Sequence, residues 1–147
     1  KTVEELREII EYAQKPFILK GIMTPAGARK ALEAGAAGIV VSNHGGRVLD
    51  QCPATAEVLP AIVEAVAGRM KIFVDGGIRT GLDVFKALAL GADGVLIGRP
   101  FVTMVYGGGA EGVRVYADKL QSELQDAMQM CGVHTLKEIT RDQILRP

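Results

Sequence analysis

A histidine and an arginine lie close together in a glycine-containing run, Ser42–Arg47, that directly follows the apolar stretch Gly38–Val41. Two glycines follow His44, so we expect its side chain to face an opening, where an imidazole can act as a general base near neutral pH. Arg47 can hold a carboxylate through two parallel hydrogen bonds. A single histidine is more often a satisfied structural group, so the catalytic interpretation depends on which other polar residues the fold brings to the same place.

Two further segments, Asp75–Arg79 and Gly98–Pro100, combine glycine with arginine. Glycine lets the backbone approach a ligand closely, and its amide can point at a phosphate oxygen. Arginine adds charge-assisted donors, and helices expected to begin near Thr80 and Pro100 would present their positive N-terminal ends. These segments predict a phosphate site. The alternative is that both arginines are surface residues paired with carboxylates.

Lys20 and Asp75 each end an apolar run. A lysine in this position can stabilise negative charge that develops on a bound cofactor or substrate, can form a Schiff base, or can sit in a salt bridge at the rim. Asp75 is a hydrogen-bond acceptor that suits a sugar or ribityl hydroxyl, and its alternative is an internal salt bridge to an arginine.

The elements that would position these residues alternate along the chain. Apolar runs that suit the strands of a parallel sheet covered on both faces stand at 17–19, 38–41, 72–74 and 94–97. Capping residues and glycines predict helices at 2–14, 24–35, 54–67, 80–91 and 110–131, with Tyr106 in a loop after a short helix. Two short turns follow at 135–138 and 140–143. The pattern predicts the α/β class.

An internal repeat refines this prediction. Shifted by 56 positions, the segment Phe17–Gly38 aligns with Phe73–Gly94, with identities that include Thr24 with Thr80 and Gly35 with Gly91. Two such units predict a half of a (β/α)₈ barrel, written (βα)₄, which would supply strands 5–8 of a domain of about 250 residues together with C-terminal helices. The competing doubly wound sheet would require a G-x-G-x-x-G fingerprint after its first strand, and none is present.

Composition excludes several classes of protein. Seventeen basic and seventeen acidic residues give zero net charge, so we expect no nucleic-acid partner. No apolar run is long enough to cross a membrane. The two cysteines, Cys52 and Cys131, lack metal-ligand spacing, so we expect no metal, reduced thiols and a cytoplasmic location.

The motifs together resemble the FMN-dependent α-hydroxy acid oxidase and dehydrogenase family, which includes glycolate oxidase, lactate oxidase and flavocytochrome lactate dehydrogenase. The similarity runs from Phe17 to the end of the chain. It is carried by Leu19–Ile22, Ser42–Asp50, Asp75–Arg79, Val84–Ala92, Ile97–Pro100 and Leu136–Ile139. The resemblance implies oxidation of a small L-2-hydroxy acid, similar to lactate or glycolate, to the 2-oxo acid.

The resemblance also implies a role for each matching residue. His44 would take the proton of the substrate hydroxyl while hydride passes to the flavin, Arg47 would hold the substrate carboxylate, and Lys20 would stabilise the reduced flavin. These three are the expected catalytic residues, and His44 and Arg47 are the expected substrate contacts. The expected FMN-binding residues are Lys20, Ser42, Asp75, Gly76, Gly77, Arg79, Gly98 and Arg99.

The family's first four barrel strands have no counterpart here, and the sequence begins at Lys1 rather than at methionine. We therefore expect residues 1–147 to be the C-terminal half of an FMN-binding barrel domain, inactive by itself. Its expected partner is the N-terminal half or a second copy of the chain, in a homo-oligomer. The alternative is a non-catalytic half barrel that binds FMN or phosphate and self-associates. The particular hydroxy acid and the electron acceptor stay open.

Overall fold

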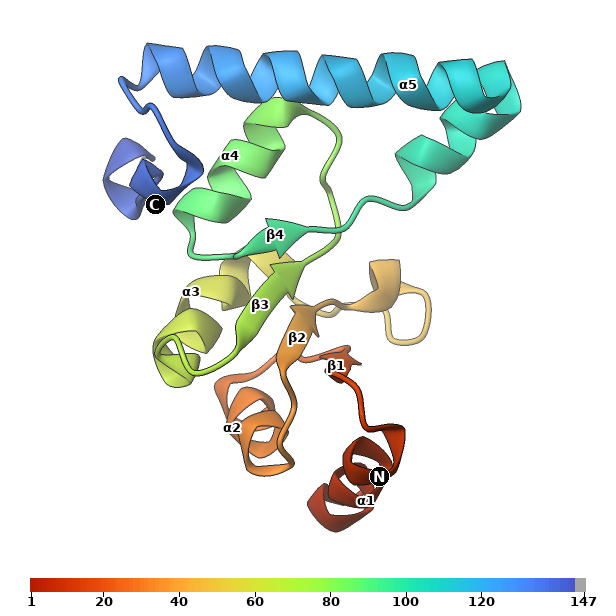
Figure 1. The fold of residues 1–147 in the computed structure, drawn as a ribbon, viewed down its shortest axis with the longest axis vertical. Helices are drawn as coiled ribbons and strands as arrows, with labels where there is room; N and C mark the ends of the chain where they lie inside the picture. The colour runs from red at the N-terminus through yellow and green to blue at the C-terminus, as the bar shows by residue number, and fades with distance from the viewer. Residues whose placement is uncertain (145–147) are drawn as a thin grey trace.

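The computed structural model describes residues 1–144 and shows helices and strands in alternation along a single curved sheet (Figure 1). The strands are β1 (Ile18–Lys20), β2 (Gly38–Val41), β3 (Lys71–Val74) and β4 (Gly94–Val95). The α-helices are α1 (Val3–Ala13), α2 (Pro25–Glu33), α3 (Thr55–Val66), α4 (Gly81–Ala89) and α5 (Arg99–Met130). Three short 3₁₀ turns are η1 (His44–Gly46), η2 (Leu136–Glu138) and η3 (Arg141–Gln143).

All four strands are parallel and lie in the order β1-β2-β3-β4, which confirms the α/β class. Each strand pairs with the next one along the chain, so the carboxyl ends of all four strands meet at one edge. β4 is shorter than the predicted strand at 94–97 and ends at Val95, although the Leu96 amide still donates to the Val74 carbonyl at 2.9 Å. The residues after Leu96 leave the sheet and enter the first turn of α5.

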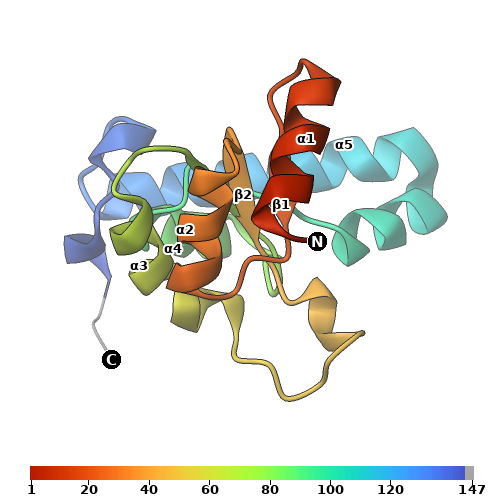
Figure 2. The same ribbon diagram turned by 90° about the horizontal axis from the view of Figure 1, so that it is seen from below.

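The two faces of the sheet differ. Alternate strand residues on one face, such as Ile39, Val41 and Ile72, are at most 3% exposed and pack in the core with α2 and α3. Figure 2 shows α2, α3 and α4 on one side of the strands. On the other, concave face Ile18 is 47% exposed, and Leu96 beyond β4 is 39% exposed. β2 is nevertheless buried along its whole length, and Val40 on the concave face is 5% exposed. In the described residues burial on both faces therefore holds for β2 but not for the outer parts of the sheet.

The two repeat units match closely in the structure. Thr24 caps α2 and Thr80 caps α4, each by accepting a hydrogen bond from the amide three residues ahead, and both helices are nine residues long. The glycines that follow them, Gly35 and Gly91, have φ of 89° and 101°. The strand pairing differs by one position, since Ile18 opposes Gly38 whereas Phe73 opposes Gly94. The repeat therefore preserves the helices and their caps more strictly than the strand register.

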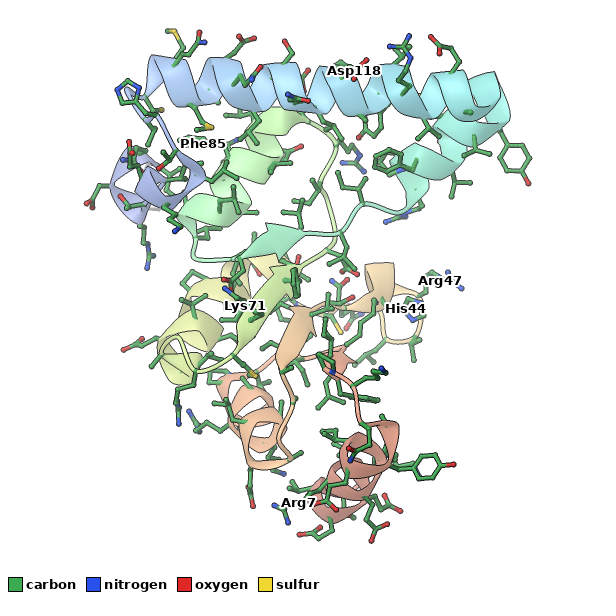
Figure 3. The ribbon with its side chains drawn as sticks, viewed as in Figure 1. Arg7, His44, Arg47, Lys71, Phe85 and Asp118 are labelled. Atoms are coloured by element: carbon green, nitrogen blue, oxygen red, sulfur yellow. The ribbon has the colours of Figure 1, made fainter. Side chains whose placement is uncertain are left out.

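The long C-terminal helix α5 consists of two segments joined at Gly109, whose φ of 55° and ψ of −139° break the helical geometry. The break falls in the predicted glycine run, but the first segment already starts at Arg99 and includes Tyr106, which was expected in a loop. The second segment lies along α4, and Phe85 of α4 points toward it (Figure 3) in a cluster with Leu124 and Met128. In residues 1–144 no helix is both long and apolar enough to cross a membrane.

Candidate functional site

A cavity of about 570 Å³ opens at the carboxyl ends of β2, β3 and β4. It brings together residues from three segments that are far apart in the sequence: the η1 turn, the loop after β3 and the start of α5. Its lining includes His44, Gly45, Arg47, Asp75, Gly76, Gly77, Ile78, Arg79, Gly98, Arg99, Thr103 and Tyr116. Two predicted site residues, Lys20 and Ser42, do not line the cavity. Each contacts a residue that does: Lys20 contacts Asp75, and Ser42 accepts from the His44 amide.

The loop after β3 is shaped for close approach of a ligand. Gly76 and Gly77 both have left-handed backbones, with φ of 90° and 80°, a conformation that costs other residues about 1 kcal/mol or more. A side chain built at Gly77 or at Gly98 would meet no atom within 4 Å, so both glycines border open space. The Gly77 and Ile78 amides have no hydrogen-bond partner among the described residues. They are free to bind an anion.

The two neighbouring helix N-termini differ in what they offer an anion. At α4 the Arg79 and Thr80 amides both donate to Asp83, and the Gly81 amide donates to Glu123 of α5. The positive ends of both helices were expected at the phosphate site, and at α4 carboxylates of the chain already accept from these three amides. At α5 the N-cap is Gly98, which supplies no side-chain cap. The start of α5 thus keeps its donors and its positive end for a ligand.

We call the open backbone at Gly76–Ile78 and at Gly98 the anion cradle, and Arg79 and Arg99 flank it. Both side chains are exposed, and neither forms an ion pair within residues 1–144, so the alternative of surface arginines paired with carboxylates does not hold there. The Arg99 guanidinium also reaches the η1 turn, where Nη2 would lie 3.4 Å from a Cβ placed on Gly45. One arginine therefore connects the anion cradle to the loop that carries the histidine.

Lys20, Ser42 and Asp75 meet on the concave face of the sheet. The Lys20 Nζ donates to Ser42 Oγ at 2.8 Å and lies 3.3 Å from Asp75 Oδ2. The predicted alternative for Asp75 was a salt bridge to an arginine, and its partner is instead this lysine. Among residues 1–144, Asp75 Oδ1 is buried and finds no hydrogen-bond partner. A buried acceptor without a donor is costly, so this atom marks a place where a ligand hydroxyl would be favourable.

The backbone around the histidine is fixed by neighbouring side chains. Asn43 Oδ1 accepts from the Gly45 amide at 3.0 Å, and Ser42 Oγ accepts from the His44 amide at 3.1 Å. These bonds hold His44 at φ 54°, an uncommon conformation that persists mainly where surrounding contacts impose it. The His44 and Arg47 side chains are exposed on the loop after β2 (Figure 3) and both line the cavity.

Sequence reasoning missed two residues that support the site. The Thr55 hydroxyl, at the start of α3, donates to the Asp75 carbonyl at 2.6 Å and lies beside Gly76. Tyr116 of α5 lines the cavity and donates to the Arg79 carbonyl at 2.8 Å. Thr55 carried a signal, because it stands at the predicted start of a helix after the histidine motif. Tyr116 carried none, because it is 37 residues from its partner.

The donor set fits a phosphorylated ligand that also carries hydroxyl groups. Free amides, an open helix start and two unpaired arginines face one end of the cavity, and an acceptor and a lysine lie beyond it. No group of three or more metal-ligating side chains occurs in the described part of the chain. FMN has both features, a phosphate and a ribityl chain, so the residues present fit this group.

The fold and the site are those of an α/β protein whose cavity suits a phosphorylated cofactor. The chain belongs to the FMN-dependent dehydrogenase family, whose model matches residues 1–146. FMN is therefore its cofactor. Among solved structures similar to this chain, a mandelate oxidase variant was determined with a C4a-OH-FMN adduct.

The relatives are oxidases and dehydrogenases of hydroxy acids. The chain is 49% identical over 144 residues to a peroxisomal (S)-2-hydroxyacid oxidase of Arabidopsis thaliana, covering 98% of the chain and 39% of the relative. It is 48% identical to an L-lactate oxidase of a Roseobacter species, covering 96% and 38%. A mandelate oxidase structure superposes with a TM-score of 0.92 at 45% identity, covering 96% of this chain and 42% of that one.

The chain thus spans about two fifths of the length of these relatives. The predicted family membership and the predicted cofactor are confirmed. The cytoplasmic location, the oligomeric state and the individual site residues stay predictions, and the Arabidopsis relative is described as peroxisomal.

Proposed function

We propose that this chain supplies the phosphate-binding and proton-accepting part of an enzyme that oxidises a small L-2-hydroxy acid to the 2-oxo acid. The observation that carries the proposal is the single cavity that holds the histidine–arginine turn and the anion cradle together. A base, a carboxylate-binding group and a flavin site are what this oxidation needs within one pocket. We further propose that residues 1–147 correspond to strands 5–8 of a (β/α)₈ barrel.

When bound, FMN supplies the hydride acceptor. Arg79, Arg99 and the backbone at Gly76, Gly77 and Gly98 would hold its phosphate, and Asp75 would accept from its ribityl hydroxyls. Ser42 adds a further polar contact to the cofactor. Lys20 provides the positive charge that stabilises electron density gained by the ring system.

The η1 turn acts on the substrate. Arg47 binds the carboxylate of the hydroxy acid and so fixes its orientation. His44 accepts the proton of the α-hydroxyl, which allows the carbon to give up its hydride. The lysine is committed to Ser42 and Asp75 in the structure, and this arrangement supports an electrostatic role rather than a Schiff base.

The concave face, with Ile18 and Leu96 partly exposed, is open in residues 1–144. We expect the chain to bind FMN but not to turn over until a second half, from the N-terminal part of a barrel or from a second copy, covers this face.

The test is a chimera in which the chain replaces the matching segment of the Arabidopsis oxidase. We expect L-lactate or glycolate to reduce its flavin anaerobically, and His44→Gln to slow that reduction by roughly 10²–10⁴-fold, the usual contribution of a general base. His134→Gln is the matched control, because the other histidine is also exposed but lies far along the chain. Equal rates for the two variants would refute the role of His44.

A further inference from the structure

The second segment of α5 places one aromatic side chain, that of Tyr116, against both elements that form the anion cradle, the loop after β3 and the start of α5. Tyr116 is the buried residue of this 32-residue helix, with 6% of its surface exposed. Its hydroxyl donates to the Arg79 carbonyl at 2.8 Å. Its ring meets Phe101 edge to face, with centroids 5.0 Å apart and an interplanar angle of 73°. Phe101 follows Arg99 by two residues, so Tyr116 contacts the elements that carry both arginines.

The hydrogen bond fixes the orientation of one peptide group. The Arg79 amide donates to Asp83 and the Arg79 carbonyl accepts from Tyr116, so the backbone of this arginine is held from both sides. Within residues 1–144 the Arg79 carbonyl has no other hydrogen-bond partner. Loss of the tyrosine hydroxyl would leave this carbonyl unsatisfied and free the loop after β3 to change its conformation.

The Tyr116 hydroxyl is suited to remain a hydrogen-bond donor. Burial raises the pKa of Tyr116, the charge of Asp83 raises it further, and the charge of Arg79 opposes both. The group therefore keeps its proton across the neutral range and stays a donor.

We propose that Tyr116 is a positioning residue for the cofactor phosphate: it sets the separation of Arg79 and Arg99 so that both face one phosphate group. The inference rests on the proposed function, because it needs that phosphate to be bound between the two arginines. The ring contact with Phe101 places the start of α5, and the hydroxyl places the loop after β3. Tyr116 touches neither the substrate nor the flavin in this role.

The test compares Tyr116→Phe, which keeps the ring and removes the hydroxyl, with Tyr106→Phe and the unaltered chain. Tyr106 is in the first segment of the same helix and is 90% exposed, so it controls for the chemical change. Calorimetry gives the dissociation constants for FMN and for riboflavin, which lacks the phosphate. Hydrogen exchange of residues 76–82, measured by mass spectrometry without flavin, reports on the loop itself.

We expect Tyr116→Phe to weaken FMN binding by about 3- to 10-fold, the usual effect of one lost hydrogen bond, with riboflavin binding unchanged and exchange at 76–82 faster. Tyr106→Phe should alter none of these. An equal loss for FMN and riboflavin would show a general structural role and overturn the inference. Unchanged exchange at 76–82 would also overturn it. If the unaltered chain binds no FMN, the proposed function fails for the chain alone, and the same variants are compared in the chimera with the Arabidopsis oxidase, where an unchanged FMN dissociation constant for Tyr116→Phe overturns the inference.

Discussion

At Gly81 the start of α4 lies directly against the backbone of α5, and replacing this glycine tests whether the contact holds the site. A Cβ at Gly81 would lie 2.3 Å from the Leu124 amide nitrogen and 2.4 Å from the Leu120 carbonyl oxygen. Both are backbone atoms of a long helix and cannot rotate away. Gly81→Ala must therefore push the two helices apart.

The expected cost follows from three contributions. Overpacking of this kind costs about 1–3 kcal/mol. Separation of the helices also weakens the bond from the Gly81 amide to Glu123, now 2.8 Å, which contributes about 1 kcal/mol. Alanine gains up to about 1 kcal/mol over glycine in helix propensity. With the alanine gain taken in full, the net loss is about 1–3 kcal/mol in the free energy of unfolding, or roughly 3–10 °C in the midpoint of thermal unfolding for a domain of this size.

The assay is urea unfolding followed by far-ultraviolet circular dichroism. Gly108→Ala is the matched control, because a Cβ there would meet no atom within 4 Å and the residue also lies in a helix. We expect Gly108→Ala to leave the stability unchanged or to raise it. A Gly81→Ala chain as stable as the unaltered one would show that the helices separate at no cost. It would refute the reasoning that packing of α5 against Gly81 holds the loop that leads into α4 in place.

Two further predictions concern charged residues. Arg99→Ala should weaken FMN binding, measured by flavin fluorescence, by about 10- to 100-fold, the value of a hydrogen bond to a charged group. Arg29→Ala, at an exposed position of α2, should leave the dissociation constant unchanged. Equal effects of the two substitutions would contradict the role of Arg99 in binding the phosphate. Burial acts to raise the pKa of Asp93, but hydrogen bonds from Lys71 and from the Ile72 amide outweigh it and the pKa is lowered. The carboxylate therefore stabilises the fold above its ordinary pKa and loses this effect as the pH falls through the lowered value. Asp93→Asn should thus destabilise the chain in urea at neutral pH but not in strong acid, and a loss independent of pH would rule out the ionic contribution.

Local features of the fold could be predicted from the sequence because their signals are local. Thr2, Thr24 and Thr80 each stand one residue before a helix and do cap it. Glycines after α2 and α4 mark their ends, and the apolar runs locate the strands to within one or two residues. The break in α5 was visible as a glycine run, whereas the helical conformation before it was not, because glycines at 107 and 108 adopt helical geometry in spite of their low propensity.

The residues that line the cavity could be predicted from the sequence, but the hydrogen-bond and ion-pair partners of the side chains could not. The residues that line the cavity follow strands, and parallel strands end at one edge, so their assembly follows from topology. The partner of a side chain depends on register and on long-range packing. A salt bridge was one alternative for Lys20, but its partners Ser42 and Asp75 could not be named, and nothing indicated that Glu123 would accept from the start of α4 from 42 residues away. That last contact distinguishes the two helix starts expected at the phosphate site, because it occupies an amide at α4.

The two repeat units place their positive charge at different positions relative to the sheet. The turns after β1 and β3 share a left-handed glycine, Gly21 in one and Gly77 in the other, with φ of 99° and 80°. In the first turn the cation, Lys20, precedes the glycine and lies on the concave face, while in the second turn the cation, Arg79, follows the glycine by two residues. Equivalent positions hold Gly76 and Met23, so neither turn carries both cations. The two turns thus share one left-handed glycine but differ in where the cation stands: in the first it is paired with Asp75 on the concave face, and in the second it lines the cavity.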